Sequence, residues 1–170
     1  VMPADRAGVL IEAADHQAPS MENNNVHSDC VENTPYIMAT RDETATHATY
    51  ICNLKNGNVV GYKYLDFGEE PANEAALLLT AGEELKAAAA EIWLDAPTAE
   101  AGGTKLGTVA FDADALANAE KQETASDGTV WSWISTGLDV PAAGIHAVYF
   151  VFTSEADGVL CGFDRFVFEK

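Results

Sequence analysis

The sequence predicts an all-β protein built as an antiparallel sandwich. Short runs rich in β-branched and aromatic residues recur at roughly 8–15-residue intervals, and turn-forming residues separate them. No alternation of strands with helices indicates a nucleotide-binding α/β fold. With a length of 170 residues, the chain fits one domain that can bury a sizeable core. We therefore expect residues 1–170 to form a single β-sandwich domain.

The C-terminal stretch carries the strongest strand signal. Residues 144–152 and 159–168 are apolar runs on either side of a polar turn, and we expect them to form neighbouring strands. The first run is apolar on both faces of its pleat, which predicts an interior strand. In the second run, strict alternation places Asp164 on the same face as Phe166. A carboxylate among phenylalanines is unfavourable unless it is paired or binds a metal.

The remaining strands are predicted from the same pattern. A first strand begins at Val9 and includes Glu12, and residues 34–38 form an edge strand because their proline cannot donate to a ladder. The segment 55–58 predicts a hairpin turn between the strands on either side of it. Further strands are expected over residues 49–52, 59–67, 75–79, 88–94, 104–111, 131–134 and 137–140.

The secondary structure of two regions is less obvious from the sequence. Residues 83–94 are rich in helix formers, but residues 92–94 run directly into the turn at 95–97, so we expect a strand over residues 88–94. Residues 112–128 are polar and alanine-rich, and we expect a long connection containing one or two helical turns.

The charge and the cysteines narrow the function classes. A formal net charge of −18 repels phosphate backbones and anionic lipids, so neutral partners such as sugars, or cations, are favoured. No apolar run approaches the ~20 residues that a membrane-spanning helix needs. Cys30, Cys52 and Cys161 contain no Cys-x-x-Cys pair. We expect buried or free thiols, with a Cys30–Cys52 bridge as the alternative.

No catalytic constellation is visible in the sequence. It contains no Gly-x-Ser-x-Gly, phosphate-binding glycine loop or His-Glu-x-x-His motif, and its four histidines are scattered. Acids are abundant, but abundance alone does not indicate a glycosidase pair. We therefore expect a protein without enzymatic activity.

One pair of acids stands out as a candidate metal site. Glu12 and Asp164 each lie in a predicted strand near one end of the chain, and chain termini often lie close together. Two carboxylates that meet there would suit calcium, which takes oxygen ligands. The alternative is that Asp164 pairs with Arg165 or a lysine, or is exposed to solvent.

The aromatic residues fall into two groups. Rings at loops or strand ends can stack on the apolar faces of sugars, and rings inside strands are expected in the core. Trp131 and Trp133 share one face, so at least one of them is expected to be buried. The first group comprises Tyr36, Tyr50, Trp131 and Trp133, and the second comprises Trp93, Tyr149 and Phe150.

Several segments, taken in chain order, resemble family 6 carbohydrate-binding modules. The most specific are Leu-Asp-Ala-Pro-Thr at residues 94–98 and Gly-Thr-Lys-Leu-Gly-Thr-Val at residues 103–109. Residues 34–38 resemble the versions attached to arabinofuranosidase- or xylosidase-type glycoside hydrolases. The other matching segments are residues 11–16, 56–68, 144–152 and 162–168.

The resemblance implies a jelly-roll sandwich that is part of a secreted, extracellular glycoside hydrolase. As an isolated module it is expected to be a monomer. It would bind a plant polysaccharide, of the xylan or arabinoxylan type or another β-glycan, without cleaving it.

The resemblance also implies particular site residues. A structural calcium ion would be bound partly by Glu12 and Asp164, although the second acid of the family's first strand is replaced by Ala14. The sugar would lie in a loop cleft between Tyr50 and Trp131, where an asparagine of the family corresponds to Gly162. These departures leave three possibilities: altered specificity, use of a second cleft on the concave sheet face, or a structural spacer that has lost sugar binding.

Overall fold

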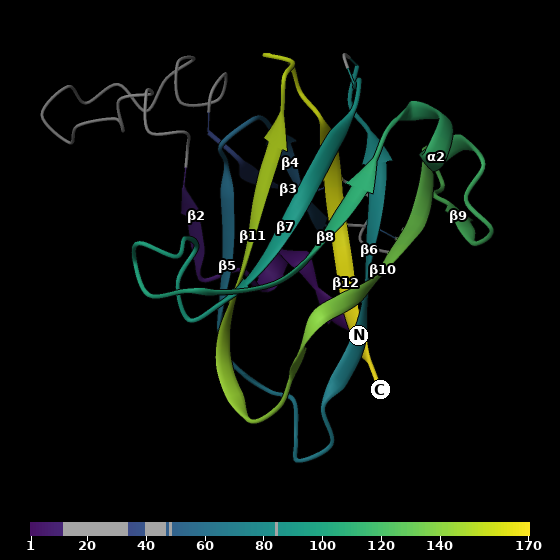
Figure 1. Ribbon diagram of the computed structural model, residues 1–170. Coiled ribbons are helices and arrows are strands. Elements are labelled where there is room, and N and C mark those ends of the chain that lie inside the picture. The colour runs from purple at the N-terminus through teal and green to yellow at the C-terminus, as the bar shows by residue number, and fades with distance from the viewer. Residues whose placement is uncertain (12–33, 40–46, 48, 84) are drawn as a thin grey trace, which may run out of the picture.

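The computed structural model describes residues 1–11, 34–39, 47, 49–83 and 85–170, which form two antiparallel sheets packed face to face (Figure 1). The predicted all-β sandwich is confirmed. One sheet has the order β3 (Tyr36–Ala39), β4 (Thr49–Leu54), β12 (Cys161–Glu169), β6 (Ala72–Ala81), β10 (Val130–Ala142) and β9 (Gln122–Thr124), with β1 (Met2–Pro3) also paired to β12. The other has the order β2 (Val9–Ile11), β5 (Val59–Asp66), β11 (Ile145–Ser154), β7 (Ala88–Leu94) and β8 (Thr104–Phe111).

Helices are short in the part of the chain that the structure describes. They are the 3-10 turn η1 (Ala4–Arg6) and α2 (Ala113–Ala117). Asp112 caps α2 because its Oδ1 accepts a hydrogen bond of 2.7 Å from the Ala115 N–H. No helix among these residues is long and apolar enough to cross a membrane.

Alternation of apolar residues predicted the strands well. The strand over residues 88–94 is β7, in which every second residue from Ala88 to Leu94 is buried. Residues 104–111 form β8, and β3 is an edge strand as its proline indicated. The two runs at residues 131–134 and 137–140 join in the single strand β10.

The predicted neighbours of two strands were wrong. The C-terminal runs do not pair with each other, because β11 lies in the five-stranded sheet between β5 and β7 while β12 lies in the other sheet between β4 and β6. Likewise, the turn at residues 55–58 connects β4 to β5 across the sandwich and closes no hairpin. In both cases consecutive strands face each other, so that the apolar sides of the two sheets bury one another.

A β-bulge in β12 corrects the predicted position of Asp164. Phe163 pairs with Leu79 and Arg165 with Leu78, so Asp164 is an extra residue relative to β6. Because of this insertion Phe163 and Phe166 both point into the core, although they are three residues apart. Asp164 therefore does not share a face with the phenylalanines.

Aromatic rings fill the space between the sheets. Phe150 of β11 is fully buried and its ring contacts those of Phe163, Phe166 and Tyr62. The Tyr62 hydroxyl donates a hydrogen bond of 2.8 Å to the carbonyl oxygen of Ala4, which ties the N-terminal segment to the core.

The two ends of the described chain lie side by side. Met2 of β1 pairs with Phe166 of β12, and Figure 1 shows the two termini close to each other. Of the described cysteines, Cys161 is a buried free thiol and Cys52 is a free thiol, as predicted, and the alternative bridge between Cys30 and Cys52 stays untested. Cys30 lies outside the described residues.

Candidate functional site

The predicted sugar-stacking residues at one end of the sandwich come together around Gly162. Tyr50 lies on β4 and Trp131 on β10, and their ring centroids are 5.0 Å apart in an edge-to-face contact. A Cβ atom at position 162 would lie 3.3 Å from Trp131 and 3.4 Å from Tyr50. Gly162 therefore lies directly beneath both rings. Tyr36, on the neighbouring strand β3, pairs in register with Cys52.

The space between Tyr50 and Trp131 is closed in this structure. Two rings that sandwich a sugar must be about 7–8 Å apart, because each stacking contact needs 3.5–4.0 Å. Trp131 is 1% exposed, and His47 stacks on it with ring centroids 5.2 Å apart. Trp131 is thus the buried member of the Trp131–Trp133 pair. A sugar-binding role for Tyr50, Trp131 and Tyr36 stays a prediction, and it requires these rings to separate.

Both tyrosines of this site keep their hydroxyl protons at physiological pH. A side-chain hydrogen bond with Cys52, together with burial, raises the pKa of Tyr36 to about 12. Burial is the largest cause of the raised pKa of Tyr50. Neutral phenols can both donate and accept hydrogen bonds, as sugar hydroxyls require.

The described residues do not fit a calcium ion at Asp164. This side chain is 5% exposed, and its Oδ2 accepts hydrogen bonds from Arg165 Nε and from His47 Nδ1, the latter at 2.9 Å. A guanidinium group beside the carboxylate opposes a second cation. No group of three His, Cys, Asp or Glu side chains in the described ranges could hold a metal. Glu12 lies outside these ranges, so its role as a calcium ligand stays a prediction.

A second aromatic pair lies on the outer face of the five-stranded sheet, and the sequence prediction placed it wrongly in the core. Trp93 of β7 and Tyr149 of β11 pair in register, and both are half-buried, while the residues flanking each in sequence point into the core. We call Trp93 and Tyr149 the sheet-face pair. Glu91 lies on the same face two residues before Trp93, and this acid was the signal that the face is open to solvent.

The protein holds both rings of the sheet-face pair in place. The Trp93 Nε1–H donates a hydrogen bond of 3.1 Å to Glu91, whose other oxygen accepts one of 2.6 Å from Lys105 Nζ. Tyr149 lies over Gly61, where an added Cβ would meet the tyrosine ring at 2.8 Å. Only glycine leaves the ring in this position. The pair therefore offers two fixed aromatic surfaces beside a carboxylate and an ammonium group.

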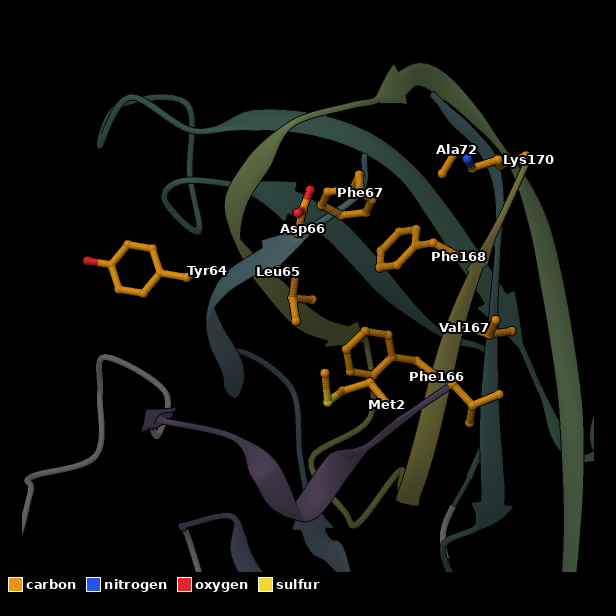
Figure 2. Close-up of a pocket in the computed structure, with 11 residues that line it drawn as sticks. Met2, Tyr64, Leu65, Asp66, Phe67, Ala72, Phe166, Val167, Phe168 and Lys170 are labelled. Carbon is orange, nitrogen blue, oxygen red and sulfur yellow. The ribbon is translucent and has the colours of Figure 1, made fainter. Parts of the chain in front are cut away.

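A third feature is an apolar pocket toward the other end of β12, with a volume of about 340 Å³. Figure 2 shows Phe67, Phe168 and Phe166 along one side of it and Tyr64 at its edge. The ring centroids of Phe67 and Phe168 are 4.9 Å apart. Tyr64 is 78% exposed and has a φ of +61°, a conformation that costs a non-glycine residue about 1–2 kcal/mol.

Solved structures with a similar fold include carbohydrate-binding modules. A family 6 carbohydrate-binding module, studied by sub-site dissection, is 24% identical and covers 96% of this chain and 95% of its own, with a TM-score of 0.56. CsCBM6-3 from Clostridium stercorarium, in complex with cellobiose, is 21% identical over 95% of this chain and 93% of its own, with a TM-score of 0.56. These similarities agree with the β-sandwich fold of this chain.

Some similar structures belong to larger enzymes. In a family 43 arabinoxylan arabinofuranohydrolase from Bacillus subtilis, in complex with cellotetraose, the match is 21% identical with a TM-score of 0.60. It covers 80% of this chain and only 24% of the enzyme. No curated protein matches the chain.

The family is established by a direct match to its sequence model. The model for carbohydrate-binding module family 6 matches residues 34–170, and the chain therefore belongs to this family. Family 6 is a non-catalytic, carbohydrate-binding family, in agreement with the lack of catalytic motifs.

Proposed function

We propose that this chain binds a β-linked polysaccharide on the outer face of its five-stranded sheet and directs an attached glycoside hydrolase to it outside the cell. The observation that carries this proposal is the sheet-face pair, Trp93 and Tyr149, whose rings are half-exposed and held by neighbouring groups. The sheet-face pair combines accessible rings with polar partners, whereas the Trp131 ring of the Tyr50–Trp131 pair is covered.

The chemistry of this face suits a neutral sugar ring. Pyranoses have apolar C–H faces that stack on aromatic rings, and their hydroxyls need both donors and acceptors. Glu91 supplies an acceptor and Lys105 a donor, and the two side chains are 28% and 38% exposed. Because both are already oriented by their mutual ion pair, a ligand has less conformational entropy to remove on binding.

The ligands of similar structures support a β-glycan as the polymer. One neighbour was solved with cellobiose, and another, from Bacillus halodurans, is described as a β-1,3-glucan-binding module. The resemblance of residues 34–38 adds xylan or arabinoxylan to the candidates. We therefore propose xylan, arabinoxylan or another β-glycan as the target.

Removing both rings of the sheet-face pair tests this function. In affinity gel electrophoresis with xylan, arabinoxylan and β-glucan, we expect the polysaccharide that retards the wild type to bind Trp93→Ala/Tyr149→Ala roughly 5- to 150-fold more weakly, since each of the two rings contributes about 0.5–1.5 kcal/mol. Thr124→Ala, an exposed change on β9, serves as the control. Retardation that is lost in Tyr50→Ala and kept in the double variant would move the site to the loop end. No retardation of the wild type on any polymer would contradict sugar binding.

A second candidate function is a structural one, in which the apolar pocket packs against a catalytic domain of the same polypeptide. Strained backbone at an exposed tyrosine beside a hydrophobic hollow favours this reading (Figure 2). In that case Tyr64→Asp would lower the melting temperature of the full-length enzyme by several degrees and leave that of the isolated module nearly unchanged. Equal shifts in both proteins would exclude such packing.

A further inference from the structure

A groove of about 340 Å³ crosses the outer face of the seven-stranded sheet, on the opposite side of the sandwich from the sheet-face pair. We call it the Trp133 groove. Its floor consists of small side chains in register, because Ser135 of β10 and Val167 of β12 both pair with Ala76 of β6. Larger residues at these positions would fill the hollow, so its depth follows directly from the sequence.

Trp133 forms the wall of this groove and is held in a fixed orientation. Its Nε1–H donates a hydrogen bond of 2.8 Å to Glu123, and its backbone N–H donates one of 3.0 Å to the carbonyl oxygen of Lys121. The ring is half-buried, whereas Trp131, two residues earlier on the same face, is 1% exposed beneath His47. Trp133 is thus the member of the pair that a ligand can reach.

The rim supplies charged groups that can bind hydroxyls. Lys121 Nζ lies over the Trp133 ring, 5.1 Å from its centroid, so this flexible side chain has to turn aside for a sugar to stack on that face, and its ammonium group can then donate to the sugar hydroxyls. Glu120 and Glu169 line the groove as acceptors, and Ser135 is exposed on its floor. The combination of one fixed ring, both hydrogen-bond polarities and a shallow floor is the chemistry of saccharide recognition.

We propose that the Trp133 groove is an additional saccharide-binding site, in which a neutral sugar ring stacks on Trp133 and its hydroxyls bind Lys121 and Glu169. This inference depends on the proposed function insofar as both sites take the same class of ligand. Since the two sites lie on opposite faces of the sandwich, one module would bind two chains of a polysaccharide. Its binding to a polymer would then be tighter than its binding to a short oligosaccharide.

Tryptophan fluorescence can isolate this site. The chain has three tryptophans, so Trp93→Phe leaves buried Trp131 and half-exposed Trp133, and acrylamide quenching then reports mainly on Trp133. The probes are xylotetraose, cellotetraose and laminaritetraose. We expect at least one of them to reduce quenching at least twofold in Trp93→Phe. The protection should disappear in Trp93→Phe/Ser135→Met, where the floor is filled, and persist in Trp93→Phe/Thr124→Met, which places the same side chain outside the groove.

The outcomes separate this site from the proposed function. In one outcome, calorimetry shows that the wild type binds a probe and that Trp93→Ala/Tyr149→Ala does not, while Trp133 is not protected from acrylamide. This outcome would overturn the second site and leave the proposed function intact. Protection of Trp133 that Ser135→Met does not alter would also overturn the second site. If the wild type bound none of the probes or polymers, both proposals would be wrong.

Discussion

Phe150→Ala will lower the free energy of unfolding by about 3–5 kcal/mol, the usual cost of removing a fully buried phenylalanine. Phe150 is 0% exposed and its ring joins both sheets, since it contacts Tyr62 of its own sheet and Phe163 and Phe166 of the other. The cavity left behind would be bounded by large rings that cannot easily collapse into it. Urea unfolding followed by fluorescence should show a lower midpoint with little change in the m-value.

The neighbouring residue provides a matched control for Phe150. Val151 lies on the same strand but points to the outer face and is half-buried. Val151→Ala should therefore cost about 1 kcal/mol or less. Similar midpoints for the two variants would mean that the ring cluster is not the centre of the core.

Asp164→Asn will destabilise the protein by about 3 kcal/mol, which corresponds to a drop of about 6–12 °C in melting temperature for a chain of this size. The substitution keeps the shape of the side chain and removes its charge. Buried His47 then loses the carboxylate it contacts at 2.9 Å, and Arg165 loses its charged acceptor. Differential scanning calorimetry in the presence of excess EDTA, and again with calcium, measures the effect.

The same pair of conditions tests the predicted calcium ion. If Arg165 and His47 are the only partners of Asp164, the difference in melting temperature between the wild type and Asp164→Asn is the same with EDTA as with calcium. A melting temperature of the wild type that falls with EDTA and recovers with calcium, together with no such response in the variant, would instead support a calcium ion bound by Glu12 and Asp164. Glu91→Gln, a change in a surface ion pair, controls for non-specific effects of charge.

The sequence predicted the strands better than their partners. Alternation decides which residues of β7 face the core, and it located Ala88–Leu94 correctly despite their helix propensity. Alternation does not say which strands pair with each other. The apolar faces of β11 and β12 would be buried whether the two strands were neighbours in one sheet or, as here, lay in different sheets. The bulge at Asp164 was also invisible, since an inserted residue leaves no mark in the hydrophobic pattern.

The candidate sites were only partly predictable for a related reason. Tyr50 and Trp131 were correctly expected to be near each other, but the burial of Trp131 depends on His47, a residue distant in sequence. Trp93 and Tyr149 were assigned to the core because hydrophobicity does not distinguish an aromatic ring in the core from one on an outer sheet face. The acid at position 91 and the glycine at position 61 carry that information, and both become meaningful only once the register is known.

Because of the bulge in β12, the residues that fill the core differ from the residue that makes the buried polar contacts. Phe163 and Phe166, on either side of the insertion, supply the core, so the inserted Asp164 adds a polar side chain without displacing either ring. A change at position 164 would therefore act through the contacts with His47 and Arg165, and the register of the sheet would stay the same.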